Sequence, residues 1–243
     1  ERMLMVNKSA LKLQHKKNII KIFGKKPLNP IDVEVPGDPS SAAFFTALTL
    51  LNKKSSLKIK NVGLNPTRTG FYKLLKKHGA KIKFKNLRKK NNEVRGDIYV
   101  KSSKIKPISA SSNYYVNSTD EYPILFVLAA LIPGTSLFRG IQDLSNKESN
   151  RIKEMQKILL QIGVRTKFQN NILKIHGIDK IKKKYNKILV PNLGDHRICM
   201  SSFILAKLTG VKSFIRNFET VFTSSPSFLE IIKTLGANFE KQK

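Results

Sequence analysis

The stretch Lys147-Glu148-Ser149-Asn150-Arg151 lies at the start of a helical pattern that runs from 152 to 162. Lys147 and Arg151 are four residues apart and share one face of the predicted helix, and Glu148 precedes Arg151 by three. Two cations at a helix N-terminus, where the helix dipole favours negative groups, repel each other unless an anion lies between them. The pattern favours a phosphate or carboxylate site. The alternative is a solvated helix start with a Glu148–Arg151 ion pair worth about 0.2–0.5 kcal/mol.

This helix belongs to a pattern that occurs three times. Each copy opens with an aspartate, a favoured N-cap residue, followed by an apolar segment that predicts a buried helix. A β-rich segment, an amphipathic helix ending at a glycine and a further strand complete each copy. The opening aspartates are Asp38, Asp120 and Asp195, the buried helices are 40–51, 121–132 and 196–208, the β-rich segments are 57–62, 135–139 and 211–215, the glycines are Gly79, Gly163 and Gly236, and the final strands are 81–85, 165–168 and 238–240. The sequence therefore predicts three β-α-β-α-β units forming one α/β domain.

The repeat also predicts where an anion site would lie. If the copies are related by approximate symmetry, their helix N-termini gather on equivalent faces and their free amides attract anions together. Arg68, Lys147, Arg151 and Arg197 all stand at such N-termini. The repeat thus predicts that these four cations are grouped by the architecture of the domain.

Length and composition narrow the class of protein. A chain of 243 residues fits one large domain, or one domain with a fragment of another. Residues 1–4 read as the end of a helix already under way, so we expect the chain to be truncated at its start. No apolar run predicts a membrane span, and no signal peptide is recognisable. The single cysteine, Cys199, lies in an apolar pattern that predicts burial, and this usage fits a reducing, cytoplasmic setting.

The formal charge of +30 raises the alternative of a nucleic-acid-binding module. We disfavour that alternative, because the lysines are spread along the polar faces of predicted helices and strands rather than gathered in one block. No RNA-binding aromatic signature or zinc finger is recognisable. A general lysine bias or anionic substrates explain the charge equally well, so we expect no nucleic-acid partner.

Six motifs together resemble the 5-enolpyruvylshikimate-3-phosphate synthase family. They follow the family's order and spacing along the whole chain, and six motifs in register make a specific signal. The motifs are Val35-Pro-Gly-Asp-Pro-Ser-Ser-Ala-Ala-Phe-Phe45, Asn65-Pro-Thr-Arg-Thr-Gly70, Asp120-Glu-Tyr-Pro-Ile-Leu125, Lys147-Glu-Ser-Asn-Arg151, Asp195-His-Arg-Ile-Cys-Met200 and Thr223-Ser-Ser-Pro226. The resemblance implies residues 1–34 as the tail of an N-terminal domain that is missing here, and 35–243 as the C-terminal enolpyruvyl-transferase domain. It implies a domain of three β-α-β-α-β-β units, an inside-out α/β barrel.

The resemblance also implies a reaction. The family transfers the enolpyruvyl group of phosphoenolpyruvate to the 5-hydroxyl of shikimate 3-phosphate and releases phosphate, a step toward chorismate and the aromatic amino acids. It uses no metal or organic cofactor, and we expect a cytoplasmic enzyme that is a monomer when full length. The site lies between two domains, so we expect this chain alone to be inactive.

Residue roles follow from the same resemblance. Asp120 would hold and deprotonate the hydroxyl, and Glu148 would serve in proton transfer. Lys147 would contact shikimate 3-phosphate, and Arg151 and Arg197 would clamp phosphoenolpyruvate, because their planar forks suit carboxylates and phosphates. From the residues alone, Asp120 reads as a helix cap, Arg197 as an ion-pair partner of Asp195, and His196 as a packed core histidine, which we favour for His196.

Two positions depart from the family pattern. Asn150 replaces an aspartate, and Ser225 stands where phenylalanine is common; neither is expected to do chemistry. Some members also carry a lysine near Thr223 that is absent here. The nearest rival enzyme is the enolpyruvyl transferase acting on UDP-N-acetylglucosamine, which the motifs at 147–151 and 195–197 argue against.

Overall fold

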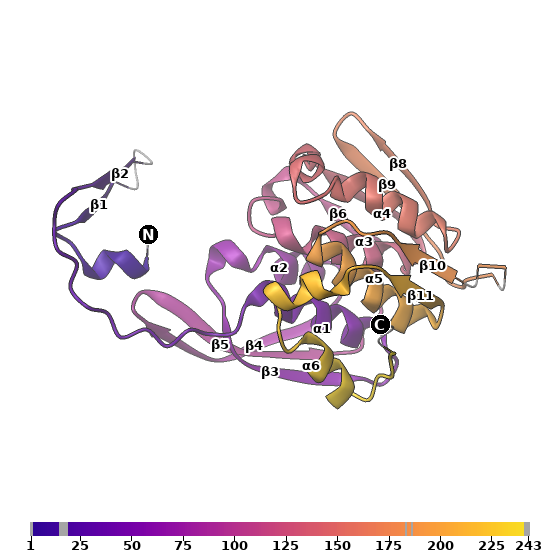
Figure 1. Cartoon of the computed structure of the whole chain (residues 1–243), viewed down its shortest axis with the longest axis horizontal. Helices are drawn as coiled ribbons and strands as arrows, with labels where there is room; N and C mark the ends of the chain where they lie inside the picture. The colour runs from indigo at the N-terminus through magenta and orange to yellow at the C-terminus, as the bar shows by residue number, and fades with distance from the viewer. Residues whose placement is uncertain (1, 15–18, 183, 186, 241–243) are drawn as a thin grey trace.

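The protein forms a mixed α/β domain in which sheets surround a bundle of buried helices (Figure 1). The computed structural model describes residues 2–14, 19–182, 184–185 and 187–240. Three helices fill the centre and pack against one another: α1 (Pro39–Leu51), α3 (Tyr122–Ala130) and α5 (His196–Thr209). All nine residues of α3 are buried, as expected for a helix that is apolar on every side. This arrangement confirms the α/β class and the three buried helices predicted from the repeat.

The first two repeats form sheets that match the prediction closely. In the first, β3 (Ser56–Gly63) and β4 (Lys81–Lys90) pair antiparallel with β5 (Glu93–Lys101). In the second, the order is β6-β7-β9-β8. Its strands are β6 (Ser109–Ala110), β7 (Gly134–Arg139), β8 (Arg165–Gln169) and β9 (Ile172–Gly177). In every copy the segment before the buried helix pairs parallel with the strand that follows the helix: Gly37 with Val62, β6 with β7, and β10 (Lys187–Val190) with β11 (Lys212–Ile215).

The third repeat is shorter than predicted. Among the described residues, its sheet contains only β10 and β11. The prediction of a strand at 238–240 is wrong, because these residues form no strand. The backbone there has no ladder partner among the described strands; instead, the carbonyl oxygen of Asn238 accepts a hydrogen bond of 2.7 Å from the Lys207 ammonium group. A side chain has therefore taken the place of a neighbouring strand.

The second helix of each copy ends as the glycine pattern predicts. These helices are α2 (Gly70–Lys77), α4 (Arg151–Leu160) and α6 (Phe228–Thr234). Gly79, Gly163 and Gly236, which follow them, have φ values of +101°, +83° and +83°. The left-handed region costs glycine little, so these positions stop each helix and turn the chain.

Short 3-10 helices connect the larger elements and carry several polar side chains of interest. They are η3 (Pro66–Arg68), η4 (Ser112–Tyr114), η5 (Thr119–Glu121), η6 (Gln142–Asn146) and η7 (Phe218–Thr223). Each of η3, η5, η6 and η7 lies shortly before a helix of the repeat. The turns thus bring polar residues to the N-terminal ends of the helices.

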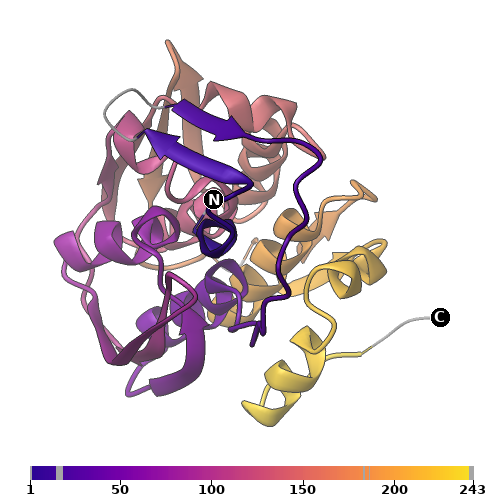
Figure 2. The same ribbon diagram turned by 90° about the vertical axis from the view of Figure 1, so that its left-hand side faces the viewer.

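The N-terminal segment extends away from the domain in Figure 1, and it faces the viewer in Figure 2. It contains η1 (Met3–Val6) and an antiparallel hairpin of β1 (Leu11–Gln14) and β2 (Ile19–Ile22), then an extended stretch. The predicted helix end at residues 1–4 corresponds in part to η1, and Glu1 lies outside the described residues. The extended stretch is tied to the first sheet by an ion pair of 3.0 Å between Glu34 and the buried Arg95. In the part of the chain that the structure describes, no helix is long and apolar enough to cross a bilayer.

Candidate active site

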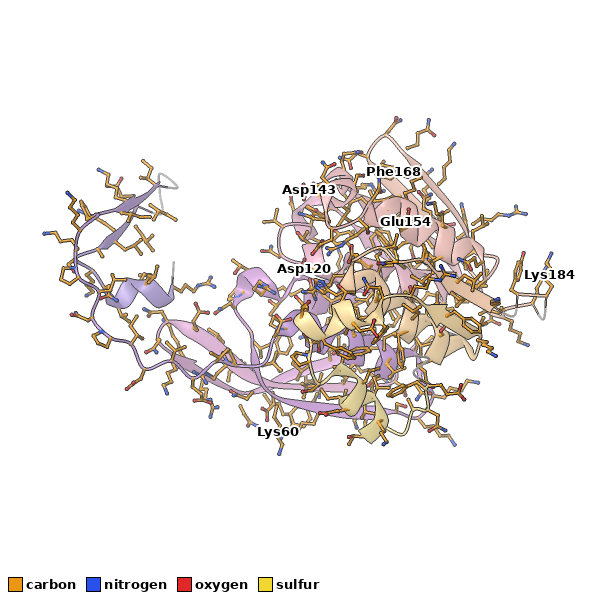
Figure 3. All side chains as sticks on the ribbon, viewed as in Figure 1. Lys60, Asp120, Asp143, Glu154, Phe168 and Lys184 are labelled. Carbon is orange, nitrogen blue, oxygen red and sulfur yellow. The ribbon has the colours of Figure 1, made fainter. Side chains whose placement is uncertain are left out.

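The N-terminal ends of α4 and α5 and the turn η5 bring four of the five predicted site residues together. Arg151 is the first residue of α4, Glu148 lies three residues before it, Arg197 is in the first turn of α5, and Asp120 is in η5. In the view of Figure 3, Asp120 lies at the edge of the domain nearer the N-terminal segment. Of the four cations predicted to lie together, two, Arg151 and Arg197, share the carboxylate of Asp120.

Arg151 is the centre of this group. Its side chain is only 1% exposed, and its guanidinium group contacts three carboxylates. Nε lies 2.9 Å from Asp195, Nη2 lies 2.6 Å from Glu148, and Nη1 lies 3.6 Å from Asp120. A buried guanidinium needs such partners, because removing an unpaired charge from water is very costly. The predicted Glu148–Arg151 pair is confirmed.

Asp195 holds Arg151 and starts α5 at the same time. Its carboxylate is fully buried and accepts hydrogen bonds from Arg151 Nε and the Ser149 hydroxyl, both at 2.9 Å. It also accepts from the backbone N–H groups of Arg197 and Ile198, as the predicted N-cap. Burial alone would raise the pKa of Asp195, but the bond and charge of Arg151 and the other donors lower it below 3.8. The carboxylate is thus kept ionised as a fixed anchor.

The side chain of Arg197 pairs with Asp120, not with Asp195. Arg197 Nη2 lies 3.5 Å from Asp120 Oδ2, longer than the 2.7–2.9 Å of a strong charge-assisted bond. Within the described part of the chain, Arg197 Nε, Arg197 Nη1 and Arg151 Nη1 are buried and make no hydrogen bond. Buried donors are normally satisfied, so these three donor nitrogen atoms suit the binding of an anion. The half-exposed carboxylate of Asp120 is close to both guanidinium groups, but its contacts of 3.5 and 3.6 Å are long.

Asp120 is not the helix cap that its position in the repeat predicts. It lies inside the 3-10 turn η5, and Glu121, in helical conformation, precedes α3 without a side-chain cap bond. Pro123 in the first turn of α3 removes one of the N–H groups that would need capping. The Asp120 carboxylate is consequently free to face Arg151 and Arg197.

Lys147 differs from its predicted placement. Asn150 caps α4 by accepting a hydrogen bond of 3.0 Å from Lys153 N, so the helix begins at Arg151. Lys147 lies before the helix in extended conformation and does not share a helical face with Arg151. Its ammonium group lies 2.7 Å from Asp143, which also accepts a bond of 2.7 Å from the Tyr115 hydroxyl. No contact in the described structure joins Lys147 to the other four residues.

Arg68, the fourth cation predicted at a helix N-terminus, reaches the group indirectly. Arg68 Nη2 donates to Ser40 Oγ at 3.0 Å and lies 3.3 Å from Asp38. Ser40 in turn donates to the buried carboxyl group of Glu121, the residue after Asp120. Sequence reasoning did not single out Ser40 or Glu121, because the contact that joins them spans 81 residues.

His196 and Cys199 lie on α5 close to Asp195. His196 is half-buried at the first position of the helix, so the prediction of a packed core histidine is wrong. Burial, followed by the positive charge of Arg197, lowers the pKa of His196 below 6.5. Cys199 is buried as predicted, and burial raises the pKa of its thiol to about 12, so it is no nucleophile at neutral pH.

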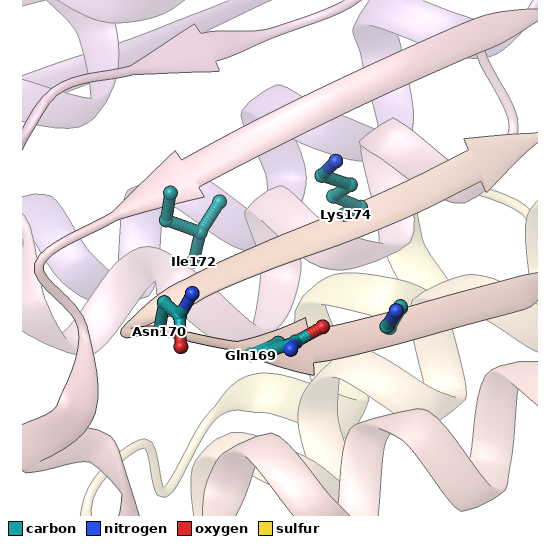
Figure 4. A pocket seen from close by; sticks show the side chains of 5 residues that line it. Gln169, Asn170, Ile172 and Lys174 are labelled. Carbon is teal, nitrogen blue, oxygen red and sulfur yellow. The ribbon is translucent and has the colours of Figure 1, made fainter.

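Two surface hollows lie apart from this group of residues. One of about 180 Å³ is lined by Lys167, Gln169, Asn170, Ile172 and Lys174 at the β8–β9 turn (Figure 4). The other, of about 170 Å³, lies on the first sheet beside Asn86 and Asp97. In residues 2–14, 19–182, 184–185 and 187–240, no three His, Cys, Asp or Glu side chains are placed to hold a metal ion.

Comparison with known proteins gives a consistent result. The sequence model of the family described as EPSP synthase (3-phosphoshikimate 1-carboxyvinyltransferase) matches residues 1–232. The 3-phosphoshikimate 1-carboxyvinyltransferase of Zymomonas mobilis is 38% identical over 224 residues, which are 91% of this chain and 49% of the relative. The enzyme of the same name from Aquifex aeolicus is 37% identical over 216 residues, 88% of this chain and 49% of the relative. The chain thus spans about half the length of the curated relatives it matches.

Comparison with solved structures points to the same family as the sequence comparison. EPSP synthase from Acinetobacter baumannii superposes with a TM-score of 0.82 at 31% identity, covering 96% of this chain and 53% of that one. The enolpyruvyl transferase NikO from Streptomyces tendae, at 16% identity and a TM-score of 0.56, shares the fold over 82% of this chain and 43% of its own.

Proposed function

The chain belongs to the EPSP synthase family, and from that membership we propose that it supplies one wall of a site that joins phosphoenolpyruvate to shikimate 3-phosphate. In this reaction the 5-hydroxyl oxygen adds to C2 of phosphoenolpyruvate while a proton adds to its methylene carbon. The methyl group then loses a proton as the C–O bond to phosphate breaks, which leaves the enolpyruvyl ether and inorganic phosphate. The proposal divides the chain into an N-terminal tail, 1–34, and an enolpyruvyl-transferase domain, 35–243.

One observation carries the proposal: three buried guanidinium nitrogen atoms of Arg151 and Arg197 make no hydrogen bond in the described structure. Both substrates are phosphate-bearing anions, and phosphoenolpyruvate also carries a carboxylate, so planar guanidinium donors suit them. Asp120 lies 3.6 Å from one of these donors, Arg151 Nη1, too far for a hydrogen bond, and an anion bound to the two guanidinium groups would satisfy the donors better. Arg151 and Arg197 are therefore assigned to phosphoenolpyruvate.

The carboxylates have separate tasks in this proposal. Asp120, once an anion takes its place beside the arginines, accepts the proton of the 5-hydroxyl. Glu148, fixed at 2.6 Å from Arg151, is about half exposed and serves in proton transfer to and from the reacting carbon. Lys147, 2.7 Å from Asp143, is assigned to shikimate 3-phosphate and must leave Asp143 to reach it. The scheme uses no metal or organic cofactor, and we place the full-length enzyme in the cytoplasm as a monomer.

The proposal is tested by phosphate release. We expect the 243-residue chain alone to release no phosphate from the two substrates, because the opposite wall of the site is absent and water is not expelled. Adding the N-terminal half of the Zymomonas mobilis relative should restore turnover if the two halves dock. UDP-N-acetylglucosamine in place of shikimate 3-phosphate serves as the control. Turnover with that sugar nucleotide alone, or full turnover by the chain without the added half, would contradict the proposal.

A further inference from the structure

Glu121 is a buried carboxyl group directly behind the candidate site. Its side chain is 3% exposed and accepts a hydrogen bond from the Ser40 hydroxyl at the start of α1. Ser40 accepts from Arg68 Nη2 at 3.0 Å, and the same nitrogen lies 3.3 Å from Asp38. A chain of three side chains thus ties the turn that carries Asp120 to the first repeat.

This environment changes the acidity of Glu121. Burial raises its pKa to about 7, the charge of Asp120 adds to the rise, and the Ser40 bond and the charges of Arg197 and Arg68 oppose it. A carboxyl group in apolar surroundings favours its neutral form unless enough donors or cations compensate. Glu121 therefore exchanges a proton near neutral pH, where exposed carboxyl groups are fully ionised.

The charged groups that act on Glu121 come from three elements, η3, η5 and α5. Asp120 precedes it on η5, Arg68 ends η3, and Arg197 begins α5. Asp38, the cap of α1, lies 3.3 Å from Arg68 and interacts with Tyr72. Tyr72 of α2 is fully buried, donates to the Pro39 carbonyl oxygen at 2.6 Å, and has its pKa raised by burial and by Glu121. Arg197 therefore has two roles. Its charge stabilises the Glu121 carboxylate, and its unbonded Nε and Nη1 atoms belong to the proposed anion site.

An anion bound by Arg197 changes this balance. The anion uses the positive charge that had favoured the Glu121 carboxylate and adds negative charge of its own nearby. Both effects favour the protonated form of Glu121. By thermodynamic reciprocity, a protonated Glu121 also strengthens anion binding by the same factor.

We propose that Glu121 is a positioning residue that takes up one proton from solvent when an anion binds to Arg151 and Arg197, and returns it when the anion leaves. The inference rests on the anion site of the proposed function and adds the residue that sets its affinity. Only the O–H bond of the carboxyl group forms and breaks. The affinity of the site for anions therefore falls as the pH rises through neutrality.

The test uses the 243-residue chain and sulfate, an anion that does not itself titrate near neutral pH. Calorimetry at pH 6, 7 and 8.5, in two buffers with different heats of ionisation, measures affinity and proton uptake together. Salt at 0.15 M screens surface lysines beyond roughly 8 Å, and Arg197→Gln shows how much binding belongs to the site. We expect wild-type affinity to fall at least about fivefold between pH 6 and pH 8.5, with proton uptake largest near pH 7.

Three variants identify the group that titrates. Glu121→Gln keeps the shape of the side chain, and should abolish proton uptake and flatten the pH dependence. Ser40→Ala removes a bond that lowers the pKa of Glu121, so its uptake should shift to higher pH. Glu230→Gln, on the exposed side of α6, should behave as wild type. Circular dichroism checks that each variant is folded.

The outcomes separate this inference from the proposed function. Absence of site-specific sulfate binding at every pH would refute both the anion site and the role of Glu121. Sulfate binding without proton uptake would refute the role of Glu121 alone. So would uptake that persists in Glu121→Gln and disappears in His196→Asn, because His196 would then be the group that titrates.

Discussion

Replacing Asp195 with alanine tests whether the buried Arg151 depends on its fixed anchor. The substitution removes the acceptor of Arg151 Nε and Ser149 Oγ, and also the cap of α5. Glu148 remains 2.6 Å from Arg151 Nη2, but it is half exposed, and Arg151 Nε loses the acceptor that it has in Asp195. Arg151 would thus be buried with only part of its charge compensated.

The expected loss of stability follows from these contacts. Breaking a buried ion pair by removing one partner costs about 3–5 kcal/mol, and losing an N-cap costs about 1 kcal/mol. Because Glu148 still compensates part of the charge, we expect a total near the lower end, about 4 kcal/mol. Such a loss is a large share of the roughly 5–15 kcal/mol that holds a typical domain folded.

Asp38→Ala is the matched control. Asp38 caps α1 as Asp195 caps α5, accepting from Ser41 N at 2.8 Å, but its cationic partner Arg68 is half exposed. Exposed ion pairs contribute about 0–1 kcal/mol, so this variant should lose about 1 kcal/mol, mostly from the cap. The two variants differ chiefly in the burial of the arginine.

Urea unfolding at pH 7 and 25 °C, followed by circular dichroism, measures both losses as shifts in the midpoint at constant slope. The reasoning is refuted if Asp195→Ala loses no more stability than Asp38→Ala. Asp195→Asn, which keeps acceptor atoms without the charge, should fall between the two.

Three further outcomes are expected. The pKa of Glu121 rises from 4.5 to about 7 on folding, so protonation of this group favours the folded state. The free energy of unfolding should therefore fall by about 3 kcal/mol as the pH rises from 4.5 to 7. Urea midpoints of Glu121→Gln should lack this pH-dependent change. In a reconstituted or full-length enzyme, Asp120→Ala and Glu148→Gln should lower kcat at least about a hundredfold with little change in KM, and near-normal kcat in steady-state assays would remove that residue from the mechanism. Gly177→Ala should cost at least about 2 kcal/mol, because a Cβ there would collide with the Ile132 carbonyl oxygen; an unchanged melting temperature would show that this region can shift.

Much of the fold could be predicted because its signals are local. An aspartate, an apolar segment and a closing glycine recur three times, and each signal acts within a few residues of its own position. The strand predicted at 238–240 is absent because a strand depends on a partner that is distant in sequence. The carbonyl oxygen of Asn238 accepts a hydrogen bond from the Lys207 side chain instead. Pairing between distant segments cannot be read from a local pattern.

In the candidate site, too, contacts between residues close in sequence were predictable and contacts between distant segments were not. The Glu148–Arg151 pair was predictable from a spacing of three residues, whereas the Asp195–Arg151 pair joins two repeats and was not expected. Asp120 reads as a helix cap in sequence, but the turn η5 points its carboxylate toward two arginines. Glu121 precedes an apolar helix and shows no sign of its buried contact with Ser40, which only the packing of three repeats creates.

The pairing of Arg151 with Asp195 has a consequence for synthesis on the ribosome. The two residues are 44 positions apart, and a ribosome that adds about 5–20 residues per second needs roughly 2–9 s to cover that interval. For most of this time the chain already contains α3 and α4 but lacks the Asp195 carboxylate that accepts the bond of Arg151 Nε. Arg151 must stay hydrated while it waits, so the close docking of α4 is completed only when α5 arrives. The second and third repeats therefore finish folding together, although the second is synthesised first.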